Sequence, residues 1–109
     1  MNNIEKGKFG EKIASEYLEK EGYKVEERNF RCRIGEIDII ATKGNIVSFV
    51  EVKTRTGEEF GRPSEAVDEH KQKKIRKAAA AYMMHNKMVN CDVSFDVVEV
   101  YCNHMENCF

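Results

Sequence analysis

The strongest constraint in this chain is a pair of apolar segments, residues 36–43 and 46–53, which flank the dipeptide Gly44-Asn45. A glycine at the first loop position supplies the positive φ that a type II′ turn requires. The two segments are therefore predicted to form an antiparallel hairpin with a two-residue loop. Such a short loop also fixes the register of the two strands.

In that register Asp38 lies opposite Glu51, and Glu36 lies opposite Lys53, all on one face of the hairpin. Side chains that face each other across two strands have Cβ atoms roughly 5 Å apart. A three-residue loop would instead place Asp38 and Glu51 on opposite faces. The two-residue loop thus predicts one cluster of three carboxylates and a lysine.

Both faces of this hairpin are largely apolar, which predicts a sheet that is covered on its two sides, as in layered α/β proteins. The predicted faces are Ile37, Ile39, Val50 and Val52 on one side, and Ile40, Val47 and Phe49 on the other.

Charged groups within such an apolar segment need a partner or a metal ion. Two carboxylates at this spacing repel each other, which raises one pKa or recruits a cation. Oxygen ligands of this kind suit Mg²⁺, which binds through one or two carboxylates together with substrate phosphate. The ammonium of Lys53 would orient or deprotonate an attacking water and neutralise charge that develops on phosphorus. These parts fit metal-assisted hydrolysis of a phosphodiester, and they equally fit an ion network that only holds the sheet together.

Asp38, followed after twelve residues by Glu51-Val52-Lys53, resembles the PD-(D/E)XK nuclease signature, with Ile37 where that signature has proline. Over nearly its whole length the chain resembles the YraN-like uncharacterised family of predicted endonucleases. The matching segments are Gly10-Glu11 with Ala14, Tyr17-Leu18, Gly22-Tyr23, Asn29-Phe30-Arg31, Gly35-Glu36-Ile37-Asp38, Phe49 to Arg55, Phe95-Asp96-Val97-Val98 and Asn107-Cys108-Phe109.

This resemblance implies a restriction-endonuclease-like αβββαβ core, in which a mixed central sheet is flanked by helices on both faces. It implies a single domain over residues 1–109 and an Mg²⁺-dependent endonuclease, with Mn²⁺ as a substitute, that acts on DNA of branched or single-stranded form. Asp38 and Glu51 would hold the metal, and Lys53 would activate water.

The resemblance also assigns a role to Glu11, in the helix predicted over residues 4–21. By its spacing alone, Glu11 is typical of a solvated helix glutamate. Archaeal Holliday-junction resolvases look similar at this point, and there a glutamate in the first helix joins the metal site. Glu11 is therefore expected to be a third catalytic and metal-binding carboxylate. Those resolvases act as pairs of subunits, so the resemblance also implies a homodimer for this chain. No segment of the sequence marks a dimer surface.

Positive residues gather between positions 53 and 77, although the net charge is only −1. This distribution resembles a protein with one basic face. A second helix is predicted over residues 65–86 with Ser64 as its cap, and its basic run is either a solvated face or a phosphate-binding surface. The candidate phosphate contacts are Lys71 and Lys74 on this helix, Arg55 beyond Lys53, and Arg31 in the connection that precedes the hairpin.

The remaining features describe an ordinary globular chain. No apolar run approaches the ~18–20 residues that span a bilayer, and the polar amino terminus has no secretory character, so a cytoplasmic location is expected. The four cysteines have no paired spacing and are interpreted as reduced thiols. The alternatives to the nuclease are a non-catalytic nucleic-acid-binding module with a vestigial site and a purely structural or interaction protein.

Overall fold

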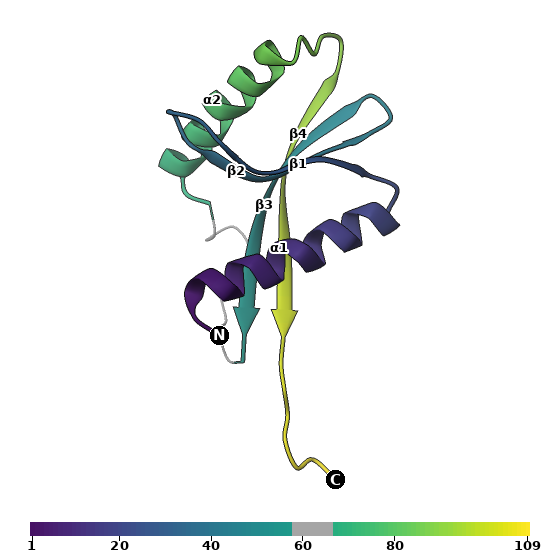
Figure 1. The fold of residues 1–109 in the computed structure, drawn as a ribbon, viewed down its shortest axis with the longest axis vertical. Coiled ribbons are helices and arrows are strands. Elements are labelled where there is room, and N and C mark those ends of the chain that lie inside the picture. Colours follow the sequence, from purple (N-terminus) through teal and green to yellow (C-terminus); the bar gives the residue numbers. More distant parts are fainter. Residues whose placement is uncertain (58–66) are drawn as a thin grey trace.

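The structure is a computed structural model that describes residues 1–57 and 67–109. Within these ranges it contains two helices and four strands in the predicted order αβββαβ (Figure 1). Their bounds are α1 Asn3–Lys20, β1 Lys24–Arg31, β2 Glu36–Lys43, β3 Ile46–Thr56, α2 Glu69–His85 and β4 Asp92–Cys102.

The strands form one mixed sheet in the order β1-β2-β3-β4. The strand pairs β1–β2 and β2–β3 are antiparallel, whereas β3 and β4 are parallel. A parallel pair requires a crossover connection, and here α2 lies within it. The mixed α/β class expected from the sequence is thereby confirmed.

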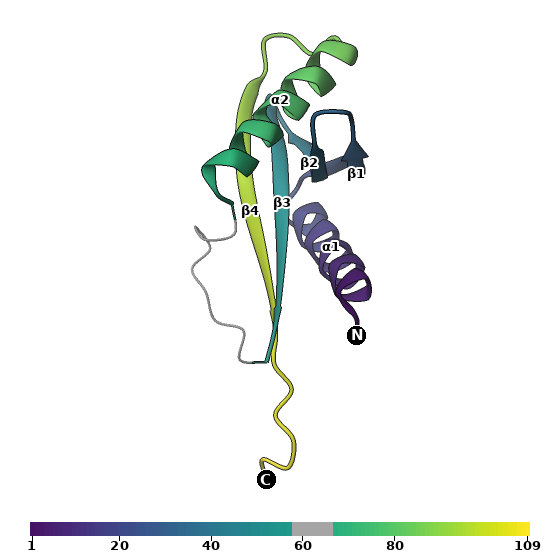
Figure 2. The same cartoon turned by 90° about the vertical axis from the view of Figure 1, so that its left-hand side faces the viewer.

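The two helices cover opposite faces of the sheet, as Figure 2 shows. Buried side chains on one face of the hairpin pack against α2, among them Ile40 and Phe49. Those on the other face, including Ile39 and Val50, pack against α1. The prediction of a sheet with two apolar faces is confirmed, and each face has its own hydrophobic cluster.

The predicted register of the hairpin is also confirmed. Thr42 pairs with Val47, and the ladder continues to the pair Ile39–Val50. Gly44 has a φ of 58°, in the left-handed region that the first position of a type II′ turn requires.

Ile37 is a correction to the predicted faces. It packs in the cluster under α2, together with Ile40, and not with Ile39. The change of face occurs beyond Ile39–Val50, the last pair of the β2–β3 ladder. In the neighbouring strand β1, Asn29 has a φ of 52°, and it lies between the residues that pair with Ile39 and Ile37. Strict alternation of side chains therefore fails in β2 between Ile37 and Ile39.

Helix α1 begins where the side chain of Asn2 accepts a hydrogen bond of 2.8 Å from the Glu5 N–H. The helix lies close to β3 at Gly10, where an added Cβ would come within 1.7 Å of Thr54 Oγ1. Glycine at this position therefore sets the distance between helix and sheet.

Helix α2 begins later than predicted. Asp68 is its cap and accepts a 2.8 Å hydrogen bond from the Lys71 N–H. The predicted cap, Ser64, lies outside the residues that the structure describes. In the described part of the chain, no helix has both the length and the apolar character needed to cross a membrane.

Candidate active site

Asp38 of β2 and Glu51 of β3 meet where the regular ladder between these strands ends. Asp38 Oδ2 accepts a 2.8 Å hydrogen bond from the Val52 N–H, so its carboxylate continues the strand pairing in place of a backbone carbonyl. The two carboxyl groups lie close enough for each to shift the pKa of the other. The structure thus brings together the two acidic residues that the hairpin register predicted.

Lys71 of α2 reaches this pair from one face of the sheet. Its Nζ forms an ion pair with Glu51 Oε1, whose side chain is only 11% exposed. The bond from the Lys71 N–H to Asp68 fixes the backbone in the first turn of the helix. Lys71 was predicted to contact phosphate, and in this structure its ammonium neutralises a carboxylate instead.

Burial dominates the acid–base behaviour of the two acids. It raises the pKa of Asp38, against the hydrogen bond from Val52 and the positive charge of Lys71, which lower it. Burial likewise raises the pKa of Glu51, although the hydrogen bond from Lys71 lowers it. Both carboxyl groups are thus costly to ionise where they stand, and a cation beside them is favourable.

The pKa of Lys71 is also raised. Burial disfavours its charged form, but the hydrogen bond to Glu51 and the charges of Glu51, Asp38 and Glu36 outweigh this effect. Lys71 is therefore positively charged at neutral pH and acts as a counter-ion for the pair.

Glu11 approaches from α1, on the opposite face of the sheet. Burial raises its pKa, a hydrogen bond with Asn29 lowers it, and the negative charges of Asp38 and Glu36 raise it further. Glu11 is thus within electrostatic range of Asp38. Across residues 1–57 and 67–109, however, no three acidic, histidine or cysteine side chains are arranged to hold one metal ion. The predicted role of Glu11 as a ligand stays a prediction.

Lys53 lies two residues after Glu51 in β3, so the two side chains share a face of the sheet. Between the described residues, no hydrogen bond or ion pair joins Lys53 to the carboxylates. Glu36, which was predicted to lie opposite Lys53, forms an ion pair of 3.4 Å with Arg31 instead. The reason is that β2 pairs with β1 at this point, where Arg31 faces Glu36.

The candidate phosphate contacts differ in their availability. Arg55 Nε lies 3.3 Å from Glu99 Oε1, in ionic contact without hydrogen-bond geometry, and the arginine side chain is only 11% exposed. Arg31 is exposed beside Glu36. Lys74 is exposed on α2, next to Gly35. Arg31 and Lys74 are thus open to a phosphate, whereas Arg55 is held within the sheet.

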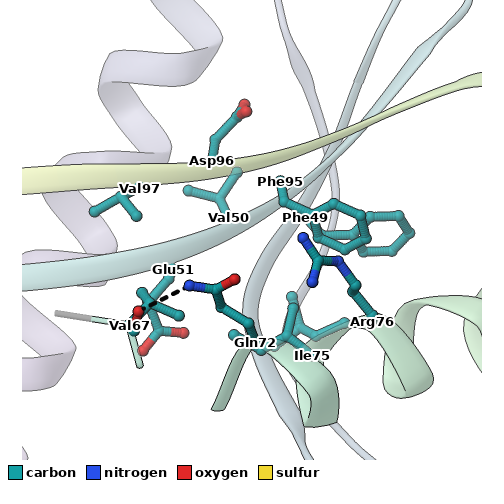
Figure 3. A pocket seen from close by; sticks show the side chains of 11 residues that line it. Phe49, Val50, Glu51, Val67, Gln72, Ile75, Arg76, Phe95, Asp96 and Val97 are labelled. Atoms are coloured by element: carbon teal, nitrogen blue, oxygen red, sulfur yellow. Dashed lines mark hydrogen bonds between the residues drawn. The ribbon is translucent and has the colours of Figure 1, made fainter. Parts of the chain in front are cut away.

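A cavity of about 320 Å³ lies between α2 and the strands β3 and β4, with Glu51 on its wall (Figure 3). Its sheet side is mainly apolar and includes Phe95 and Val97, and its helix side includes Gln72 and Arg76. No pattern in the sequence predicts this cavity. The spacing of four between Gln72 and Arg76 indicates that these two residues share a face of the helix, and the alternation in β4 indicates which of its residues share a face of the sheet. How α2 lies relative to β4 depends on contacts between residues far apart in the sequence, so local patterns do not predict it.

Comparison with known proteins places this chain among uncharacterised relatives. It is 53% identical over 103 residues to a UPF0102 protein of Caldanaerobacter subterraneus subsp. tengcongensis, a match that covers 94% of this chain and 84% of the relative. It is 48% identical to a UPF0102 protein of Clostridioides difficile over the full length of both chains. The family pattern described as "Uncharacterised protein family UPF0102" matches residues 10–100. The chain therefore belongs to the uncharacterised protein family UPF0102.

Proposed function

We propose that this protein is a metal-dependent endonuclease that hydrolyses phosphodiester bonds in DNA. The observation that carries the proposal is the contact between Asp38 and Glu51, two half-buried carboxyl groups on neighbouring strands with a lysine beside them. The order αβββαβ and the mixed sheet agree with the core of restriction-endonuclease-like proteins, which the Asp38…Glu51-Val52-Lys53 pattern resembles.

The chemistry of these side chains fits Mg²⁺, with Mn²⁺ as a substitute. Asp38 and Glu51 supply oxygen atoms only, and burial makes both of them costly to ionise without a cation. Two carboxylates, substrate phosphate and water make up the usual surroundings of a catalytic Mg²⁺. When bound, the ion would polarise the phosphoryl oxygen and make a water more acidic.

In this proposal Asp38 and Glu51 hold the ion, and Glu11 supports them from α1. Lys53 orients the attacking water, since it lies on the same face of β3 as Glu51. When substrate binds, Lys71 would contact a phosphate oxygen in place of Glu51. The phosphate role predicted for Lys71 is therefore assigned to the substrate-bound state.

A cleavage panel tests the proposal, with single-stranded, duplex, flap and four-way DNA in Mg²⁺ and in Mn²⁺. We expect the protein to cleave at least one of these substrates and Asp38→Ala to lose cleavage while it still binds DNA in Ca²⁺. Equal cleavage by Asp38→Ala would reveal a contaminating nuclease. Sedimentation of the protein with and without DNA tests the predicted homodimer.

The second candidate is a nucleic-acid-binding module without catalysis. It is favoured by the ion pair between Lys71 and Glu51, which already neutralises one carboxylate without a metal. This candidate predicts salt-dependent binding of nucleic acid that is unaffected by a chelator, and no cleavage of any substrate in the panel.

A further inference from the structure

We propose that the cavity between α2 and the β3–β4 pair takes one unpaired nucleobase of the substrate strand. This inference rests on the proposed function, because it assumes that a phosphate of the same strand lies at Asp38 and Glu51. It goes further by assigning a substrate class, namely DNA with an unpaired base beside the scissile bond.

The position of the cavity is the first argument. Glu51 lies on its wall, so one of the two carboxylates of the candidate site borders the cavity (Figure 3). Glu51 is level with Val97 in the parallel ladder, and Phe95 lies two residues before Val97 in β4, about 7 Å away. A strand whose phosphate lies at the carboxylates would therefore have this cavity beside its neighbouring base.

The exposed planar groups at the cavity are the Phe95 ring and the Arg76 guanidinium, whereas the Phe49 ring is buried. The rings of Phe95 and Phe49 stack with centroids 5.7 Å apart and an interplanar angle of 26°. The Arg76 guanidinium lies over the Phe95 ring, 5.6 Å from its centroid. Unpaired bases stack on aromatic rings and on arginine planes in this manner.

Gln72 supplies a polar group at the same wall. Its Nε2 donates a 3.1 Å hydrogen bond to the Val67 carbonyl, and its amide oxygen points away from Val67 (Figure 3). This bond fixes the orientation of the amide, so that the oxygen is presented as an acceptor for the edge of a base. A purely apolar ligand would gain nothing from this oxygen or from Glu51.

The place of the cavity between α2 and the sheet favours a single base over a base pair that is stacked in a duplex. A volume of about 320 Å³ is at the lower end of the range for small-molecule sites. A base in a duplex must leave its stack before it enters such a site, which costs a few kcal/mol. In single strands, flaps and the ends of splayed duplexes the base is already unstacked, so this cost is absent and we expect these substrates to be preferred.

The experiment compares Val97→Trp with Val93→Trp. The two valines lie on the same face of β4 and are 41% and 43% exposed, but only Val97 lines the cavity. The indole of Val97→Trp would occupy the space for the base, whereas that of Val93→Trp lies outside it. Thermal melting checks that both variants fold.

The probe is a short single-stranded DNA in which each position in turn lacks its base, bound in Ca²⁺ and followed by fluorescence anisotropy. We expect one abasic position to weaken binding by the wild type about 5- to 150-fold, the range that stacking of one base gives. Val97→Trp should bind the intact and the abasic strand equally, and Val93→Trp should behave as the wild type does. If Val97→Trp does not fold, Gln72→Ala serves as the second variant, and it should lose discrimination among the four bases at that position.

Three results would overturn the inference: no sensitivity of the wild type to any abasic position, retained sensitivity in Val97→Trp, or equal loss in Val93→Trp. A peptide or a second copy of the chain as the occupant would give the first result. A failure of the proposed nuclease function would give a different result: the affinity would depend on the base, but no DNA would be cleaved in Mg²⁺ or Mn²⁺. Cleavage without any base dependence would remove the inference alone.

Discussion

Lys71, in the first turn of α2, forms an ion pair with Glu51 in β3 and so joins the start of the helix to the acidic pair. Two carboxyl groups and one ammonium share this half-buried site. When both acids are ionised, the three groups carry a net charge of −1. Stability, metal affinity and activity are therefore linked at one place.

Replacement of Asp38 by asparagine is expected to stabilise the metal-free protein at pH 7 by about 1 kcal/mol, as relief of strain at functional sites commonly does. The amide oxygen of asparagine can still accept the Val52 N–H, while the cost of a buried charge is removed. Urea unfolding of the wild type and Asp38→Asn measures the difference. A loss of stability would mean that the charge of Asp38 itself supports the fold.

The pH dependence of stability has a definite sign. The pKa values of Asp38 and Glu51 are raised, so the native state retains a proton that the unfolded chain releases above about pH 4. The unfolding free energy contributed by this pair falls as pH rises from there through the raised native values. Urea unfolding at a series of pH values should show that the unfolding free energy falls less in Asp38→Asn than in the wild type. Equal slopes against pH would contradict the raised pKa of Asp38.

Removal of the internal counter-ion should have opposite effects on stability and on metal binding. Lys71→Gln leaves the two acids without an ammonium, so we expect this variant to be less stable than the wild type without metal. We expect it to bind Mn²⁺ about tenfold more tightly, a gain of about 1.4 kcal/mol in binding free energy. Titration calorimetry measures the affinity, and Lys73→Gln, an exposed neighbour, is the control. Unchanged or weaker Mn²⁺ binding by Lys71→Gln would show that lysine and metal do not compete.

Lys53 is expected to act on water and not on the metal. Lys53→Gln should lower the rate of cleavage at least about 100-fold, as removal of a general acid or base does. It should change the Mn²⁺ affinity less than about twofold, which is a difference of under about 0.5 kcal/mol in binding free energy. Single-turnover kinetics and calorimetry separate the two effects. A comparable loss of both would place Lys53 among the groups that shape the metal site.

Two glycines of α1 provide a matched pair of substitutions. Gly10→Ala should destabilise the protein by about 1–3 kcal/mol, because its Cβ would collide with Thr54. Gly7→Ala meets no atom within 4 Å and should stabilise the helix by up to about 1 kcal/mol. Thermal unfolding distinguishes them, and equal behaviour would mean that α1 can shift along the sheet.

Local chemistry explains which parts of the fold were predictable. The hairpin register follows from Gly44 and a two-residue loop, so the meeting of Asp38 and Glu51 could be predicted from the sequence. The face of Ile37 could not, because regular alternation along β2 would have placed Ile37 on the same face as Ile39. Nothing in the sequence around Ile37 indicates a break in this alternation.

Long-range docking explains the rest. The partner of Lys71 depends on how α2 lies over β3, and the sequence favoured Ser64 as the cap where the structure has Asp68. The partner of Arg55 depends on the parallel register of β3 and β4, which puts Glu99 beside it. The residue types of the site were thus predictable, whereas two of the predicted phosphate contacts, Lys71 and Arg55, are held by carboxylates.

The parallel ladder that joins Ile46 to Asp92 has a consequence for the order of assembly. It closes over a long stretch of chain that includes α2, whereas the hairpin closes over two residues, and short closures form faster. We therefore expect Asp38 and Glu51 to approach each other during refolding before α2 delivers an ammonium. At that stage a proton would have to neutralise the pair, so mildly acidic refolding buffer should speed the formation of native protein.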